Sequence, residues 1–149
     1  MERFAFSLEK MLGYQRQILE EEKGTLGRMM AQREELETRK SELENKLAAV
    51  RADMNRQEAA GTTIFVLRSY WSILDSGKRQ MEELLETLQG VVRRLEKQRQ
   101  AVTRASQEVK KLEKLKENQL EEYRRREAKE QQDIISEHVA NAYIRRGDS

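Results

Sequence analysis

Residues 59–71 read AAGTTIFVLRSYW and lie between two long segments that carry apolar residues at heptad spacing. The helical pattern breaks at Gly61, Thr62 and Thr63, and glycine is a poor helix former. We therefore predict that these three residues form the turn of a helical hairpin. The apolar residues that follow, from Ile64 to Trp71, are more numerous than a bare turn needs. We expect them either to cap the hairpin or to meet a partner.

Composition favours long helices over a globular core. The chain has 149 residues, of which 38% are charged and 5% are aromatic, and it contains no proline. A chain rich in Glu, Lys, Arg, Gln, Leu and Ala with regular apolar spacing is typical of a coiled coil. Disorder is the competing interpretation for so polar a chain, but the sustained heptads oppose it. We predict one all-α domain, residues 1–149, made of two long helices in an antiparallel coiled-coil hairpin.

The heptads set the expected bounds of the elements. The first helix should span about residues 4–58, the turn about 59–65 and the second helix about 66–137, with a disordered tail at about 145–149. Apolar residues at positions a and d keep one side of each helix turned toward its partner. In the first segment these positions are Leu12, Leu19, Leu26, Arg33, Lys40, Leu47 and Met54 (a) and Leu8, Gln15, Glu22, Met29, Leu36, Leu43, Val50 and Gln57 (d). In the second they are Leu67, Leu74, Met81, Leu88, Leu95, Val102, Val109, Lys116 and Tyr123 (a) and Tyr70, Gly77, Leu84, Val91, Gln98, Ala105, Leu112 and Gln119 (d).

A turn centred at residue 62 brings a positions of one helix opposite d positions of the other. Leu12 then faces Leu112, and Leu43 faces Met81. Ser76 and Gly77 are a possible kink in the second helix, or a second candidate for the hairpin break.

The second helix is expected to overhang the first, because residues after about 120 have no facing partner. Five residues near the C-terminus could form an apolar face there: Ile134, Ile135, Val139, Ala142 and Tyr143. Exposed apolar stripes often mark an interaction surface. A fraying terminus is the alternative.

Catalytic and ligand-binding signatures are missing from the sequence. There is no cysteine and one histidine, His138, which we expect to be a solvated helical residue. No phosphate-binding loop or catalytic motif occurs, and a two-helix rod offers no water-excluding pocket. We predict that the protein is not an enzyme and has no catalytic residues, cofactor, metal site or small-molecule ligand.

No run of apolar residues is long enough to span a bilayer, and the N-terminus lacks the apolar core of a signal peptide. We expect a cytoplasmic protein without direct membrane insertion. The formal net charge is +2, but residues 93–129 hold 13 Lys/Arg against 7 Asp/Glu. Such a stretch is either a solvated face or a site for an acidic protein partner. It has no interleaved aromatic residues to stack bases, so we expect no nucleic acid.

Three stretches resemble the FliJ family of flagellar export proteins. They are FAFSLEKML at residues 4–12, followed by Arg16 and three glutamates at 20–22, YWSI at residues 70–73 and RREAKE at residues 125–130. Together with the length and the absence of proline, they extend the resemblance over essentially the whole chain. Two departures stand out. Residues 131–133 read QQD where the family has Leu-Asp-Glu, and Gly77 occupies a position where the family carries an apolar residue.

The resemblance implies a non-enzymatic, stalk-like coiled coil of the flagellar type III export apparatus. It implies three partners: the hexameric export ATPase, the cytoplasmic part of the membrane-embedded export gate, and export chaperones. The protein would then be peripherally associated with the inner face of the cell membrane at the flagellar base. By analogy with rotary stalks, the ATPase-binding candidates are Phe4, Phe6, Leu8, Arg16, Arg124, Arg125, Arg126 and Lys129. The candidates for binding the gate are Leu43, Val50, Tyr70 and Ile73, although they also fit a purely structural role in the interface between the helices.

Three other functions stay open at this point. The chain fits a general structural or adaptor coiled coil, and it fits the equivalent stalk protein of a virulence type III secretion system. A helical hairpin that binds nucleic acid is the third, and its binding would weaken steeply with salt.

Overall fold

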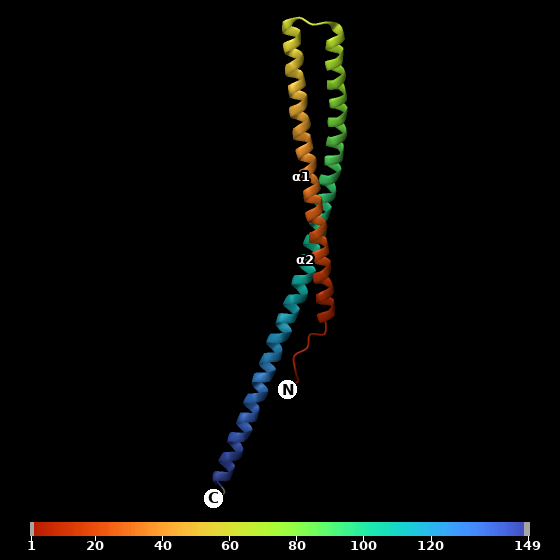
Figure 1. The fold of residues 1–149 in the computed structure, drawn as a ribbon. Helices are drawn as coiled ribbons and strands as arrows, with labels where there is room; N and C mark the ends of the chain where they lie inside the picture. The colour runs from red at the N-terminus through yellow and green to blue at the C-terminus, as the bar shows by residue number, and fades with distance from the viewer. Residues whose placement is uncertain (1, 148–149) are drawn as a thin grey trace. The chain divides into compact units, whose positions relative to one another are not determined.

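The computed structural model describes residues 2–147 and is helical over most of that length. Helix α1 spans Glu9–Ala60, helix α2 spans Ile64–Gly147, and three residues connect them (Figure 1). The predicted hairpin of two long helices is therefore confirmed. Two compact units divide the chain: one pairs Met1–Glu20 with Arg104–Ser149, and the other is Glu21–Thr103. No helix within residues 2–147 combines the length and apolar character of a membrane span.

The turn is shorter than the predicted 59–65 because each helix has its own cap. Gly61 adopts a φ of 82°, a left-handed conformation that costs glycine little, and its N–H donates to the carbonyl of Glu58 at 3.3 Å. The hydroxyl of Thr63 accepts a hydrogen bond from the N–H of Val66 at 3.4 Å, as an N-cap residue does. Helix α1 consequently continues to Ala60, and α2 begins at Ile64.

In the unit Glu21–Thr103 the two helices pack in the predicted register. Leu36, Leu47, Val91 and Leu95 are buried at a or d positions. Leu47 lies directly against Gly77, so closely that an added Cβ on Gly77 would be 2.2 Å from Cδ2 of Leu47. Helix α2 runs through this point without a break. Gly77 is therefore a site of close helix packing, and the alternative hairpin break at Ser76 and Gly77 is wrong. The kink considered at the same place stays a prediction.

The other unit has its own apolar cluster at the start of α1. Phe6, Leu12 and Val109 are its buried members. The partly buried residues packed against them are Phe4, Leu8, Leu19 and Leu112. Leu12 and Leu112, which the register places opposite each other, thus belong to the same apolar cluster.

The first helix begins later than predicted. Residues 2–6 are not helical and residues 7–8 form a turn, so α1 starts at Glu9 rather than near residue 4. We call residues 2–8 the N-terminal arm. In this non-helical arm, Phe6 packs with Val109 in the apolar cluster and Phe4 contacts Tyr123, so both rings face α2. A helix would separate them by about 200° around its axis.

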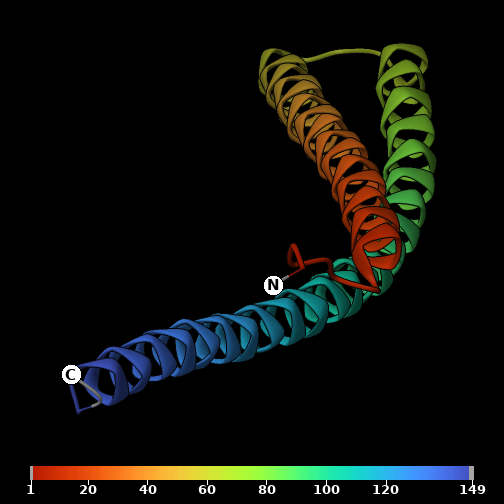
Figure 2. The ribbon, with the colours of Figure 1, turned by 90° about the horizontal axis from the view of Figure 1, so that it is seen from below.

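The second helix ends later than predicted. It continues past residue 137 to Gly147, and residues 145–147, expected in a disordered tail, belong to it. Residues 148 and 149 lie outside the described residues. Glutamate, glutamine, arginine and alanine are good helix formers and dominate residues 124–132, while glycine next occurs at residue 147. Every residue from 128 to 147, here called the C-terminal segment, is exposed, in agreement with the predicted overhang (Figure 2).

Candidate partner-binding surfaces

The N-terminal arm is held against α2 by aromatic contacts. Phe6 is 7% exposed in the cluster around Leu12. The rings of Phe4 and Tyr123 lie 5.6 Å apart between centroids, within the range of favourable aromatic pairs. The hydroxyl of Tyr123 donates a hydrogen bond to the backbone carbonyl of Glu2. Three candidate ATPase-binding residues, Phe4, Phe6 and Leu8, therefore take part in packing within this unit.

Arg16 lies apart from the basic candidates on α2. Its guanidinium forms an ion pair with Glu113 at 3.3 Å. A second pair joins Lys116 to Glu9 at 2.8 Å. Glu113 precedes Arg124 by about 17 Å along the helix at 1.5 Å per residue. Arg16 thus ties α1 to α2 and does not join the other arginines in one patch.

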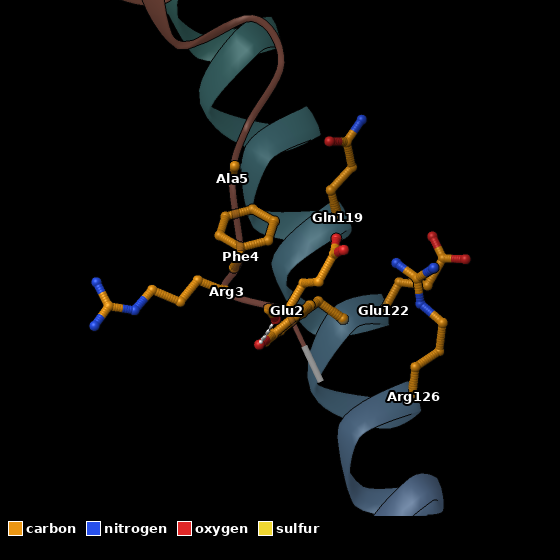
Figure 3. A pocket seen from close by; sticks show the side chains of 8 residues that line it. Glu2, Arg3, Phe4, Ala5, Gln119, Glu122 and Arg126 are labelled. Atoms are coloured by element: carbon orange, nitrogen blue, oxygen red, sulfur yellow. Dashed lines mark hydrogen bonds between the residues drawn. The ribbon is translucent and has the colours of Figure 1, made fainter.

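Arg124, Arg125, Arg126 and Lys129 form an exposed basic cluster on α2. Arg125 lies 3.9 Å from a carboxylate oxygen of Glu121, with four-fifths of its side chain exposed. Exposed pairs of this kind contribute little to stability, so the charge stays available to a partner. Arg126 also lines a hollow beside the arm, together with Phe4 and Glu122 (Figure 3). Phe4 and Arg126 thus line the same hollow.

In the unit Glu21–Thr103, two grooves lie beside the point where Leu47 packs against Gly77. One groove is lined by Leu43, Lys46, Leu47, Ser72, Ile73, Ser76, Gly77 and Gln80. The other is lined by Glu44, Leu47, Arg51, Leu74, Asp75, Lys78, Met81 and Glu82. Leu47 contributes to both. The first groove carries one charged residue, whereas the second is bordered by acidic and basic side chains.

The structure brings together two of the four candidate residues for gate binding. Leu43 and Ile73 line the first groove, where Leu43 is half-buried and Ile73 is 47% exposed. Val50 and Tyr70 are half-buried and do not line that groove. Leu43 therefore belongs to the interface and to the groove at once, and Ile73 is the most accessible of the four.

Asp75, which lines the second groove, belongs to a surface pair. Arg79 donates a hydrogen bond to the carboxylate of Asp75. This hydrogen bond, and then the positive charge of Arg79, lowers the pKa of Asp75. Among residues 2–147, no three His, Asp or Glu side chains lie close enough to hold a metal ion.

Two features of these surfaces were missed by sequence reasoning. The arm had a signal, because Phe4, Phe6 and Leu8 alternate with small residues at the period of an extended chain. The sequence signal for the grooves was weaker. A glycine at a d position lets Leu47 of the facing helix approach closely, and the alternative of a helix break at Gly77 concealed this packing.

Comparison with known proteins gives one match. The family model described as "Flagellar FliJ protein" matches residues 4–148, nearly the whole chain. No curated protein and no solved structure matches the chain.

Proposed function

The chain belongs to the flagellar FliJ family and is a component of the flagellar export apparatus, and we propose that it works there as a stalk. In this proposal it binds the hexameric export ATPase, links it to the export gate and handles export chaperones. The observation that carries the proposal is the extent of the family match, which includes both helices, the turn and residues 4–8 of the arm. We place the protein in the cytoplasm at the flagellar base, on the inner face of the cell membrane.

We assign the ATPase contact to the surface formed by the arm and the basic cluster. Arg124, Arg125, Arg126 and Lys129 are exposed, and charges at the rim of an interface steer an acidic partner toward it. Phe6 is buried, so its role is to hold the arm in place. Phe4, which is half-buried beside the basic cluster, is the aromatic residue that a partner can reach. Leu8 and Arg16 support the surface from the interface between the helices.

We assign the gate contact to the groove beside Gly77. Ile73 offers an exposed apolar side chain at its edge, and Leu43 forms part of its wall. Apolar side chains in a concave site with few charges favour a protein contact made by an apolar side chain of the partner. Val50 and Tyr70 extend the same surface toward the turn.

The ATPase contact is tested by measuring ATP hydrolysis and hexamer assembly of the cognate export ATPase with and without this protein. Wild type should promote hexamers and raise turnover, and the triple variant Arg124→Glu/Arg125→Glu/Arg126→Glu should do neither. Arg93, Arg94 and Lys97 are also exposed on α2, so changing them to Glu makes an equal change in charge elsewhere. This control variant should behave as wild type. Failure of wild type to co-elute with the ATPase or alter its turnover would refute the stalk proposal.

The gate contact is tested with two residues of equal exposure. Ile73 and Trp71 are both 47% exposed, but only Ile73 lines the groove. Ile73→Ala should weaken binding to the cytoplasmic part of the gate, and Trp71→Ala should leave it nearly unchanged. The reverse order of effects would move the contact off the groove.

A further inference from the structure

A third groove runs along α2 within the unit Glu21–Thr103, and its apolar lining consists of Leu85, Leu88 and Val92. Leu85 is 42% exposed and Val92 is 41% exposed. Leu88 is half-buried, because it occupies an a position in the interface with α1. The three residues are spaced at three and four, so they form one stripe over two turns of the helix. The pairing of α1 with α2 therefore leaves part of this stripe open.

The heptad positions of the two exposed residues indicate what could cover them. Leu85 and Val92 each directly follow a d residue, so both occupy e positions. Pairing of two helices needs apolar residues at a and d only, and e positions in such pairs often carry charges. An apolar stripe that includes e as well as a and d is typical of a helix that packs against more than one neighbour. Helix α1 is one neighbour of α2 here, and the stripe has room for a second helix.

The groove lies in an acidic part of the protein. Glu82 and Glu86 are the charged residues of its lining, and both are exposed. In the register of the hairpin, residues 80–92 face residues 32–44, and the two stretches together hold eight Asp/Glu against three Lys/Arg. Each of these three cations forms an ion pair with a glutamate of α1. The local excess of carboxylates contrasts with the formal net charge of +2 of the whole chain, and such a surface attracts a basic partner.

We propose that the third groove binds a basic amphipathic helix of another protein, which packs as a third helix against the hairpin. Helices that dock in this way use apolar anchors spaced at three and four residues. The stripe from Leu85 to Val92 is about 10 Å long at 1.5 Å per residue, which matches two turns of the incoming helix. Lysine or arginine residues beside its apolar anchors would meet Glu82 and Glu86. The same carboxylates would repel nucleic acid and anionic lipid.

This inference goes beyond the stalk function and does not rest on it. The ATPase contact uses the N-terminal arm and the basic cluster, and the gate contact uses the groove of Leu43 and Ile73. Failure of either contact would leave the third groove and its charge unchanged. Failure of the peptide binding described next would likewise leave both contacts standing.

The experiment measures binding of synthetic peptides to the full chain by fluorescence anisotropy. The first peptide is a helix of about 18 residues, or five turns, with leucines spaced at three and four and lysines at most other positions. The second carries glutamate in place of lysine. The third has the composition of the first, but its leucines are distributed evenly around the helix. Wild type should bind the first peptide, and this binding should weaken as salt is raised.

One pair of variants tests the apolar anchors. Leu85→Ser/Val92→Ser should weaken binding of the first peptide at least about tenfold, since two apolar side chains that the peptide would cover are lost. The matched control is Leu115→Ser/Ile144→Ser, whose side chains are 39% and 60% exposed outside the groove. This control should bind as wild type. Urea melts followed by circular dichroism check that each variant keeps the stability of the hairpin.

A second pair of variants tests the carboxylates. Glu82→Gln/Glu86→Gln should weaken binding about three- to tenfold at low salt, as expected for the loss of two exposed ion pairs. Glu117 and Glu137 are also exposed on α2, so Glu117→Gln/Glu137→Gln makes the same change in charge elsewhere. This second control should bind as wild type.

Several outcomes would overturn the proposal. They are no binding of the first peptide by wild type, equal binding of the second or third peptide, an equal loss in a control variant, and full binding by Leu85→Ser/Val92→Ser. A dimer in sedimentation without peptide that Leu85→Ser/Val92→Ser converts to monomer would also overturn it, because a second copy of the chain would then cover the groove.

Discussion

Replacing Gly77 with alanine tests whether close packing at this point sets the spacing of the helices. An alanine Cβ at position 77 would lie 2.2 Å from Cδ2 of Leu47 and 3.1 Å from its Cδ1 and Cγ. Leu47 is buried at 8% exposure, so its whole side chain has to shift into one of the flanking grooves. Added volume in a packed interface costs typically about 1–3 kcal/mol.

A second glycine supplies the reference for this change. Gly27 lies within α1, and an alanine Cβ there would meet nothing within 4 Å. Alanine is favoured over glycine in a helix interior by about 1 kcal/mol, and both substitutions gain this amount. Gly27→Ala should therefore stabilise the protein by about 1 kcal/mol. Gly77→Ala should be lower in stability than Gly27→Ala by the packing penalty, about 1–3 kcal/mol.

Urea unfolding followed by far-ultraviolet circular dichroism measures both free energies of unfolding. A third variant, Gly77→Ala/Leu47→Ala, isolates the contact. Leu47→Ala should cost less in the Gly77→Ala background than in wild type, because the shortened side chain no longer clashes. If Gly77→Ala is as stabilising as Gly27→Ala, Leu47 moves at no cost and the packing argument is refuted.

Three further changes address the arm, the turn and the surface. Phe6→Ala should lower the free energy of unfolding by about 3 kcal/mol and Phe65→Ala, at 77% exposure, by less than about 0.5 kcal/mol; equal losses in urea melts would contradict the packing of the arm. Thr63→Val should cost about 1 kcal/mol in the same assay by removing the N-cap, and no change would show that the hydroxyl does not cap α2. Arg79→Gln should raise the pKa of Asp75 in an NMR titration. Because folding lowers this pKa, the pair favours the folded state above the unfolded-state pKa and loses that effect as pH falls through the folded pKa; an unchanged titration would refute the pairing.

The helix–helix interface could be predicted from the sequence because its signal repeats over many turns. Of the predicted a and d residues of both helices, Gln57 alone is exposed in the structure. Charged residues at a and d positions did not prevent those positions from facing the partner helix. Arg33 and Lys40 are half-buried and form ion pairs with Glu37 and Glu44, so each stem covers the interface while its charge reaches the surface.

The ends of the helices were predicted less accurately than the helix–helix interface, because two sequence patterns overlap there. Leu8 fits the heptads of α1 and also the alternation of Phe4 and Phe6. Heptad spacing alone favours a helix from residue 4, whereas packing of both aromatic rings against α2 favours a non-helical arm. In the structure the arm is not helical, and Phe6 is buried. At the C-terminus the heptads end before the helix does, because helix propensity, and not pairing, extends α2 to Gly147.

The candidate site was harder to predict than the fold for a physical reason. The same apolar residue types serve the interface and any partner, so spacing cannot separate the two roles. Leu43 and Ile73 were both gate-binding candidates, yet Leu43, at a d position, is half-buried and Ile73, outside the a and d positions, is exposed beside a groove. The groove lies where Leu47 packs against Gly77, and this close approach becomes visible only when the two helices are placed together.

A variant tests function cleanly only where the changed side chain does not also pack in the helix–helix interface. A change at Leu43 alters the helix–helix interface and the groove together, so a loss of gate binding there has two explanations. Ile73 lies outside the buried interface, and its truncation should leave the stability of the hairpin nearly unchanged. Loss of binding by Ile73→Ala at unchanged stability, with Trp71→Ala unaffected, would therefore assign the contact to the groove itself. If Ile73→Ala weakens binding only when it also lowers the stability of the hairpin, the gate recognises the folded hairpin and not the Ile73 side chain.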